Sequence, residues 1–580
     1  MALPTGAPVS FDSLVSSFVD FVTEDPGHAV ALGLPGPHDR LSDPSLAAQA
    51  HKTERARGLL ARVQAFDGPL SFDQTLDRDL MVLELEAAIS KLTRRLNGRL
   101  ESTQLPRAAE EIGDAPFLMF INDPRPPGER LSDITARLEA TPRWLDGLLE
   151  RLDTPVQRWV DIDVERVGGL PSLFANLRGW ADHEGWADAP RLAEACRVAE
   201  DALSSYVERL RALPTTTELH LGRSGAEEIV RLRGIDLSLE DLHRLATDYL
   251  AGLGDDLEGL RGGLVAEHGL DPATTVEQLG EHLDAHHRVR IDDEGDMDAV
   301  LRRYEDERGR ILSFIAERDL FPILDDQDMR LMRTPTFMEP SIPAGAMMPP
   351  PPLRPGTKTS LVYLTLKPEL LAEHTELGIP GMMIHEGIPG HHLQLAWAAA
   401  NPSPVRRLYD GAHHAEGWTT MLEDYMLDLG YLGELTDAAR FSGKRDIARI
   451  GARVAIDLFF MTGDKGFLDV GVDCDLSSDD PFVAAGNLLQ AVTGFVPGRV
   501  QAELNWYSQE RGYPLSYLTG NHLVWALKAE LAEANRGRLE GLALDRAFHR
   551  IYLESGNMPV RWLWRVFRHH GLLPSEERVG

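Results

Sequence analysis

Cysteine is almost absent from this chain of 580 residues, which contains only Cys196 and Cys474. Two cysteines cannot form a disulfide framework, and their spacing matches no cysteine-ligated metal site. We expect both to be buried and to behave as small apolar residues. The fold must therefore be held together by a hydrophobic core and not by covalent cross-links.

Basic residues are also scarce relative to acidic ones. The chain has 59 Lys and Arg against 91 Asp and Glu, which gives a formal net charge of −32. A surface of this sign repels nucleic-acid phosphates and anionic membrane surfaces. We therefore expect neither nucleic acid nor a membrane as a partner.

Long apolar runs are missing as well. Residues 1–8 lack a basic region followed by an apolar stretch, and no segment approaches the length that spans a bilayer. The sequence therefore predicts a cytoplasmic protein.

Hydrophobic residues make up 43% of the chain, enough for a large core or for two connected lobes. Apolar residues recur at helical spacing over residues 11–22, 76–96 and 192–210, which predicts helices there. Proline is concentrated between Met338 and Gly356, which excludes a helix or a central strand and predicts an extended connector. We expect an N-terminal helical lobe over 1–337, this Pro-rich connector over 338–356, and a C-terminal lobe over 357–580.

The most informative segment is His385-Glu386-Gly387-Ile388-Pro389-Gly390-His391-His392. In the H-E-x-x-H signature, two histidines at i and i+4 bind zinc from one helix face, and the glutamate acts as general base. Here the i+4 residue is Pro389, which cannot be a ligand. In an unbroken helix His392 would lie about 10 Å along the axis from His385, too far to share one ion.

Pro389 and Gly390 offer a way to bring a second histidine back. Proline removes a helical hydrogen bond and glycine tolerates unusual backbone angles, so two residues can bulge out of the helix. Either His391 or His392 could then meet His385. We favour His391. With this choice the motif is H-E-x-x-H with two inserted residues.

A third ligand can come from the next predicted helix, over residues 413–429. Trp418, Leu422, Tyr425 and Leu429 form an apolar stripe on this helix. Glu416 lies on the opposite face together with Thr420 and Glu423, so we take Glu416 as the third ligand. Six of the 20 histidines gather in the same region, which strengthens the prediction of a metal site: His374, His385, His391, His392, His413 and His414.

Residues 385–394, followed by Glu416-Gly417-Trp418, resemble the bacterial domain-of-unknown-function 885 family, and residues 18–41 resemble the start of that family. The family is grouped with the gluzincin-like metallopeptidases, in which a His-Glu helix and a later glutamate hold zinc. The resemblance implies Zn²⁺ bound by His385, His391 and Glu416. It also implies a mainly α, large, two-lobed metallopeptidase-like fold with a small β-sheet beside the zinc-binding helix. Thr419-Thr420-Met421 depart from the family pattern, which weakens any inference about pocket shape.

The predicted function is a zinc-dependent hydrolase, and specifically a peptidase that cleaves short peptides. Zinc-activated water would attack the scissile carbonyl, with Glu386 as general base. Tyr517 is the candidate donor to the oxyanion, chosen from a downstream group that also contains Tyr507, Tyr513 and His522. The alternatives are a zinc hydrolase of a non-peptide amide or ester, and a non-catalytic binding protein that retains the fold. Sequence alone leaves the substrate, the oligomeric state and the physiological metal open.

Two further expectations concern the surroundings of this site. Residues 361–366 are rich in β-formers and predict a strand, which the resemblance nominates as the strand that pairs with extended substrate. Arg453 and Asp457 stand at i and i+4 on a predicted helix, and a salt bridge between them is the expected arrangement. Arg453 is also a weaker candidate for binding a substrate carboxylate.

Overall fold

The computed structural model describes residues 10–293, 296–335 and 345–575 and divides into two compact units. The first unit consists of Met1–Leu221 with Pro351–Pro355 and Pro402–Tyr409. The second consists of Gly222–Pro350, Gly356–Asn401 and Asp410–Gly580.

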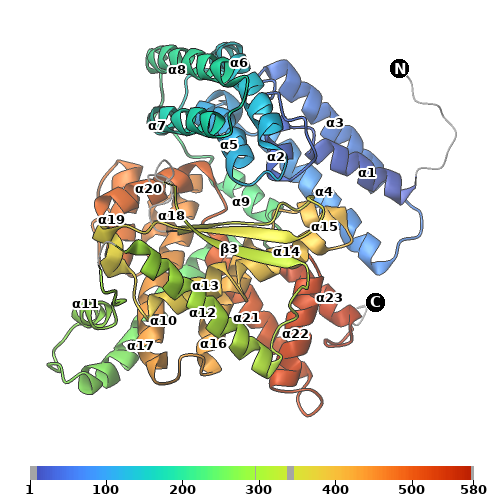
Figure 1. The fold of residues 1–580 in the computed structure, drawn as a ribbon. Helices are drawn as coiled ribbons and strands as arrows, with labels where there is room; N and C mark the ends of the chain where they lie inside the picture. Colours follow the sequence, from blue (N-terminus) through green and yellow to red (C-terminus); the bar gives the residue numbers. More distant parts are fainter. Residues whose placement is uncertain (1–9, 294–295, 336–344, 576–580) are drawn as a thin grey trace. The chain divides into compact units, whose positions relative to one another are not determined.

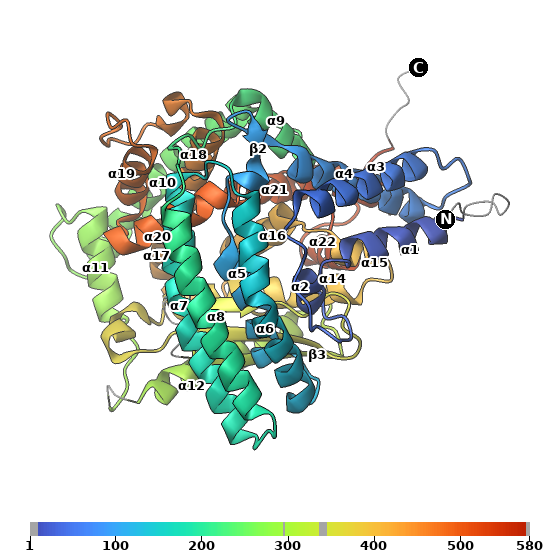
Figure 2. The same cartoon turned by 90° about the horizontal axis from the view of Figure 1, so that it is seen from above.

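The first unit is helical. Its helices are α1 (Phe11–Val22), α2 (Pro26–Ala31), α3 (Leu46–Gln64), α4 (Phe72–Thr93), η1 (Glu101–Thr103), α5 (Ala108–Ile121), α6 (Pro127–Arg151), α7 (Gln157–His183), α8 (Ala189–Arg211) and α15 (Pro404–Leu408). A two-stranded ribbon of β1 (Arg95–Leu96) and β2 (Arg99–Leu100) follows α4. In Figure 2 the long helices α6, α7 and α8 lie side by side, and α8 packs against both of the others.

The helices predicted in this half are confirmed. The stripe over residues 11–22 becomes α1, and its Phe11, Leu14, Phe18 and Phe21 are buried. The stripe over 192–210 falls on α8, and the stripes over 76–96 fall on α4 except for Leu96, which lies in β1 because α4 ends at Thr93. A capping box, in which Ser71 and Gln74 satisfy each other's backbone N–H groups, fixes the start of α4. Cys196 is buried on α8 as expected, whereas Cys474, in the second unit, is only partly buried.

The second unit combines helices with a small sheet (Figure 1). Its helices are α9 (Arg223–Leu232), α10 (Leu239–Glu267), α11 (Val276–His286), α12 (Met297–Arg318), η2 (Pro368–Glu373), α13 (Gly378–Glu386), α14 (His391–Ala400), α16 (Ala412–Asp428), η3 (Gly433–Leu435), α17 (Thr436–Ile447), α18 (Arg449–Thr462), η4 (Lys465–Leu468), α19 (Pro481–Thr493), α20 (Pro497–Gln509), α21 (Ser516–Ala534), α22 (Leu542–Glu554), η5 (Val560–Trp562) and α23 (Leu563–His569). The chain is thus mainly α, as predicted.

The sheet of the second unit has three strands in the order β3-β5-β4: β3 (Gln327–Arg333), β5 (Lys358–Leu364) and β4 (Gly345–Met348). The central strand β5 confirms the strand predicted from its β-formers, and it pairs in parallel with β3 and antiparallel with β4. Because both edges of β5 are occupied, its nomination as the strand that pairs with substrate is wrong. Within the described residues, β3 and β4 form the edges of this sheet.

The division into units differs from the one expected from proline content. Residues 222–335 belong with the C-terminal part, because α10 packs on α17 and α18, and α12 packs on α13 and β3. These contacts are made by the apolar faces of the helices, and composition alone does not indicate which helices pack against each other. Of the predicted connector, residues 338–344 lie outside the described residues, and Gly345–Met348 form the edge strand β4.

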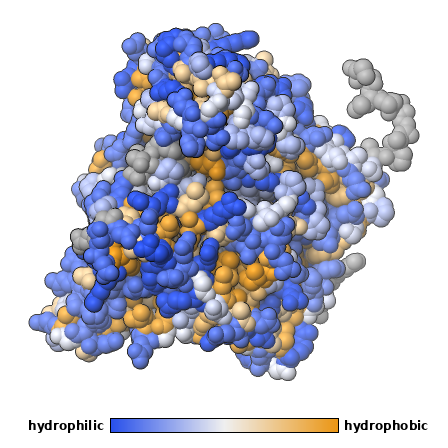
Figure 3. Space-filling model, in the orientation of Figure 1, coloured by the Kyte–Doolittle hydropathy of each residue, from blue (hydrophilic) through white to orange (hydrophobic). Residues whose placement is uncertain are grey.

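Polar residues cover most of the face drawn in Figure 3, with apolar residues in separate patches. The large hydrophobic side chains that are exposed come from scattered chain positions: Leu46, Ile323, Met332, Val483, Val496 and Leu542. No described helix combines the length and the apolar character needed to cross a bilayer.

Helices α16 and α21 approach each other unusually closely, through one glycine on each. A Cβ atom added to Gly417 would overlap the backbone of Gly520, and one added to Gly520 would overlap the carbonyl oxygen of His413. Small residues at such a crossing let two helix backbones come together. This contact fixes the position of α16, the helix that carries Glu416, against the start of α21.

We expect Gly520→Ala to lower the free energy of unfolding by about 1–3 kcal/mol, because the added methyl group overpacks the helix crossing. Chemical denaturation of the full chain measures the change. Gly252→Ala is the matched control, since Gly252 lies within α10 with open space around its Cα, and alanine there favours a helix by about 0.5–1 kcal/mol. Equal stability of the two variants would contradict the proposed close contact.

Candidate metal centre

The His-Glu motif lies where one helix stops and another begins. Helix α13 ends at Glu386, and α14 begins at His391 after a turn over residues 387–390. A Cβ atom on Gly390 would overlap the carbonyl oxygens of Ile384 and His385, so only glycine lets the chain turn this tightly against the end of α13. The structure thus has a break between two helices in place of the bulge predicted from Pro389 and Gly390.

This break brings His385 and His391 together at the carboxylate of Glu416. The Oε2 atom of Glu416 lies 3.7 Å from His385 Nε2 and 3.4 Å from His391 Nε2. The two imidazole rings are nearly perpendicular, with centroids 4.9 Å apart. One ligand atom from each of the three residues lies within 4.8 Å of the others. The three residues predicted as ligands therefore converge on one point.

These three side chains are largely buried, and two of their polar atoms lack a hydrogen-bond partner among the described residues. The side chains of His385, His391 and Glu416 are 12%, 10% and 7% exposed. Among the described residues, neither Glu416 Oε2 nor His391 Nδ1 has a hydrogen-bond partner. A buried carboxylate oxygen is costly unless it is paired or coordinates a metal. Two imidazoles and one carboxylate are a donor set that suits Zn²⁺ and leaves a further coordination position open.

The electrostatic field of the site also favours a cation. Burial opposes a charge on His385, but its contacts with Glu416 and Glu423 and the charge of Glu386 raise its pKa to about 10. Burial likewise opposes the charge of Glu416, yet His391 and His385 hold the pKa of this carboxyl well below its usual range. Both shifts express the same preference for positive charge between these side chains, which a metal ion can satisfy as well as a proton.

Glu423, two helical turns after Glu416 on α16, orients His385. Its Oε1 atom lies 2.7 Å from Nδ1 of His385. A proton on Nδ1 donated to this carboxylate leaves the Nε2 lone pair directed at the centre, which is the usual arrangement around histidine ligands. The sequence placed Glu423 on the face of Glu416 but gave it no role. The seven-residue spacing between Glu416 and Glu423, which puts both side chains on one helix face, was the sequence signal that could have indicated this role.

Tyr513 contacts the site, because its hydroxyl donates a hydrogen bond of 3.2 Å to Glu416 Oε1. Tyr517, the residue predicted as oxyanion donor, lies at the start of α21, with its ring 6.0 Å from that of Tyr513. The guanidinium of Arg453 lies 4.4 Å over the Tyr517 ring. Burial and then the charge of Glu416 raise the pKa of Tyr517, so its hydroxyl stays protonated and can donate.

The predicted salt bridge between Arg453 and Asp457 is wrong. Arg453 pairs instead with Glu503 at 2.9 Å. Asp457 accepts hydrogen bonds from the backbone N–H groups of Gly512 and Leu515 at 3.0 and 3.2 Å. It therefore holds the turn that presents Tyr513. Residues at i and i+4 can pair on an isolated helix, but here buried partners on neighbouring elements compete successfully for both side chains.

The remaining histidines of the region have other partners. His392 turns toward the sheet, where its Nδ1 lies 2.8 Å from Ser360 Oγ and its Nε2 contacts Gln327. His414 Nδ1 contacts the carbonyl of Met558 at 3.2 Å, and His413 Nε2 accepts from the backbone N–H of Val560 at 3.1 Å. His374 Nδ1 lies 3.0 Å from the hydroxyl of Tyr304. Of the six clustered histidines, only His385 and His391 face Glu416. The number of histidines in this stretch of sequence therefore overestimated the number that lie at the site.

A cavity of about 870 Å³ opens onto this centre. His385, Glu386 and Glu423 line it, whereas His391 and Glu416 lie behind that lining. Its volume falls in the range of about 300–1,000 Å³ that is typical of small-ligand sites. Glu386, next to His385 in the chain and partly exposed, is therefore placed where a bound molecule could meet both the centre and a carboxylate base.

Comparisons with known proteins point to one family and one fold. A family described as "Bacterial protein of unknown function (DUF885)" matches residues 26–566. A solved structure titled as a "putative lipoprotein of unknown function" from Shewanella oneidensis is 17% identical, with a TM-score of 0.74 over 97% of this chain and 100% of that one. A "putative lipoprotein" from Colwellia psychrerythraea is 15% identical, with a TM-score of 0.77 over 97% and 99% of the two chains. No curated protein matches the chain. At these identities the two structures show the fold alone.

We expect Glu423→Ala to weaken zinc binding by about 10- to 100-fold, because His385 loses the carboxylate that fixes its ring and tautomer. Competition with a chromophoric chelator measures the affinity. Asp428→Asn is the matched control on the same helix, since Asp428 pairs with Arg440 away from the histidines. Unchanged affinity in Glu423→Ala would show that this carboxylate does not support a ligand.

Proposed function

We propose that this chain, which belongs to the DUF885 family of bacterial proteins, is a zinc-dependent hydrolase that cleaves short peptides. The observation that carries the proposal is the buried Oε2 atom of Glu416, which faces two imidazole nitrogens and has no hydrogen-bond partner among the described residues. The same donor set in the same order along the chain supports grouping the protein with gluzincin-like metallopeptidases.

His385, His391 and Glu416 would hold the ion, and Glu423 would orient His385. When bound, zinc supplies a Lewis acid that makes water a nucleophile near neutral pH and polarises a carbonyl group. Glu386, on the cavity side of the centre, would accept the proton of the attacking water on its carboxylate. The same carboxyl group would then deliver that proton to the leaving nitrogen, so that one residue serves both transfers.

Tyr517 is the proposed donor to the oxyanion that forms when water attacks the carbonyl. Its side chain is partly buried beside the carboxylate of Glu416, and the guanidinium of Arg453 lies over one face of its ring. Tyr513 has a different proposed role, because its hydroxyl already donates to the ligand Glu416. Tyr517 would thus act on the substrate, and Tyr513 would act on the ligand Glu416.

The size of the cavity and the charges of its lining support a short substrate that carries both a positive and a negative charge. Its lining includes acidic side chains such as Glu281 and Asp424 and basic ones such as Arg449 and Arg499. A peptide of a few residues fits the volume of this cavity, and its free termini carry charges that can pair with these acidic and basic side chains. A folded protein is too large to enter the cavity. A net charge of −32 disfavours nucleic acid as a partner. The edge strand β4, beside Met382 of α13, is the candidate for pairing with extended substrate in place of β5.

The first test separates metal binding from catalysis. We expect Glu416→Ala to contain one equivalent of zinc less than wild type by plasma mass spectrometry, and Glu386→Gln to contain as much as wild type. Hydrolysis of a mixed peptide library should fall by about 10²–10⁴-fold in Glu386→Gln, because the general base is gone.

Glu434→Gln is the matched control, since Glu434 is exposed and lies outside the cavity lining. Full peptide cleavage by Glu386→Gln would contradict the proposed base. Zinc together with cleavage of esters or non-peptide amides, but of no peptide, would replace the peptidase with a hydrolase of another substrate class.

The two tyrosines are expected to differ in what their loss affects. Tyr517→Phe should lower kcat by about 10²–10³-fold with little change in KM or zinc content, as for the loss of one oxyanion donor. Tyr513→Phe should instead weaken zinc affinity, because Glu416 loses a hydrogen bond. Steady-state kinetics with chelator competition measures both effects, and the reverse pattern would exchange the two assignments.

A further inference from the structure

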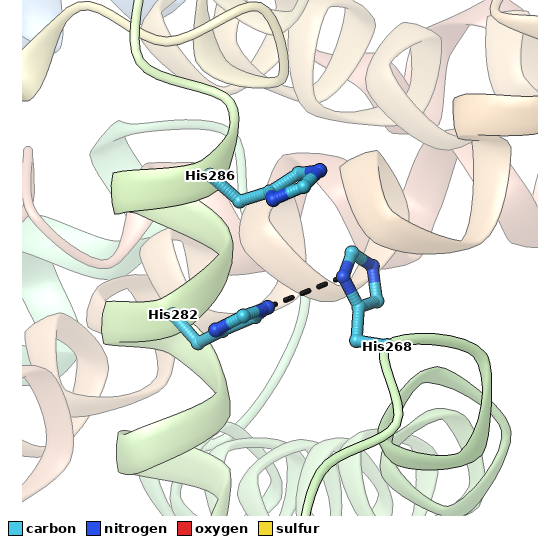
Figure 4. A group of neighbouring side chains, drawn as sticks. All are labelled: His268, His282 and His286. Carbon is cyan, nitrogen blue, oxygen red and sulfur yellow. Dashed lines mark hydrogen bonds between the residues drawn. The ribbon is translucent and has the colours of Figure 1, made fainter.

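A second group of imidazoles lies away from the Glu416 centre, at the junction of α10 and α11. His282 and His286 stand at i and i+4 on α11, and His268 caps the end of α10. In Figure 4 the side chains of His282 and His286 extend from one side of α11 toward His268. One ring nitrogen from each of the three lies within 4.8 Å of the others. Two histidines at i and i+4 are the helical pair used in many zinc sites.

We propose that His268, His282 and His286 form a second metal site, for a late first-row divalent ion such as Zn²⁺ or Cu²⁺, which clips α11 to the end of α10. Three imidazoles without a carboxylate suit these ions better than Mg²⁺ or Ca²⁺, which prefer oxygen ligands. The proposal is independent of the hydrolytic function, because none of its ligands belongs to the Glu416 centre.

The spacing of the nitrogens fits one ion. A tetrahedral ion about 2.0–2.1 Å from each imidazole nitrogen holds those nitrogens about 3.4 Å apart. His282 Nε2 and His268 Nδ1 are already 3.2 Å apart. His286 is exposed, and a rotation of its side chain would complete the third contact. Water can supply the fourth ligand from the exposed side.

The backbone beneath the three histidines is well fixed. A capping box between Thr275 and Gln278 starts α11. On its inner face Leu279 and Leu283 are buried in a core cluster with Leu264 and Val265 of α10. This cluster holds the end of α10 and the body of α11 at a constant separation. The site is therefore largely organised before an ion binds, which lowers the entropic cost of binding.

Helix α11 also forms part of the wall of the 870 Å³ cavity, through Glu281, Asp284 and Ala285. An ion bound by His282 and His286 would restrict the movement of α11 and therefore of this part of the cavity wall.

The test uses the full chain with the first centre disabled by His391→Ala and Glu416→Ala. We expect this protein to bind one Cu²⁺, with nitrogen hyperfine structure from imidazoles in its electron paramagnetic resonance spectrum. Adding His282→Ala and His286→Ala should abolish that binding, whereas adding His569→Ala and His570→Ala, an exposed pair elsewhere, should not. Absence of binding in the first protein, or binding that survives loss of His282 and His286, would overturn the proposal.

A second measurement avoids dependence on the disabled centre. In otherwise wild-type protein, zinc content should fall by one equivalent in His282→Ala/His286→Ala, and zinc should slow amide exchange over residues 269–287 only when these histidines are present. Zinc content equal to that of wild type, or exchange that zinc does not change, would also overturn the proposal.

Discussion

The candidate site depends on one buried charge, the carboxylate of Glu416. A carboxylate taken out of water is stable only when opposite charge or hydrogen bonds replace its hydration. Here one oxygen accepts a hydrogen bond from Tyr513, and the other faces His385 and His391 without a hydrogen bond. The neighbouring imidazoles can compensate this charge when they carry protons or when they share a cation with it. A metal ion would satisfy all three side chains together, and this is the basis for proposing them as a ligand set.

The surrounding architecture serves to hold Glu416 and the two histidines at this separation. Helix α16 supplies both Glu416 and Glu423, and its close crossing with α21 at Gly417 and Gly520 brings the start of α21 beside Glu416. Trp418, also on α16, donates a hydrogen bond of 2.9 Å from its indole N–H to the carbonyl of Pro389. The helix that carries the carboxylate therefore also anchors the turn that positions His391. A change at either contact would alter the ligand geometry.

Much of the site was predictable because its chemistry is concentrated in a short stretch of sequence. The His-Glu pair, the impossibility of Pro389 as a ligand, and the helix face shared by Glu416 and Glu423 all follow from spacing. The break between α13 and α14 did not follow, because it depends on how tightly the backbone at Gly390 packs against the carbonyls of α13. The role of Tyr513 did not follow either, since it depends on the turn held by Asp457. The helices of the first unit were predictable from apolar periodicity, whereas the boundary at residue 222 was not, because it depends on which helices pack together.

The central claim is that His385, His391 and Glu416 bind one zinc ion. An anomalous difference map recorded at the zinc absorption edge from crystals of the wild-type protein tests it most directly. We expect a strong peak about 2.0–2.1 Å from an imidazole nitrogen of both histidines and about 2.0–2.2 Å from a carboxylate oxygen of Glu416. Crystals grown with zinc that show no anomalous peak among these three side chains would contradict it.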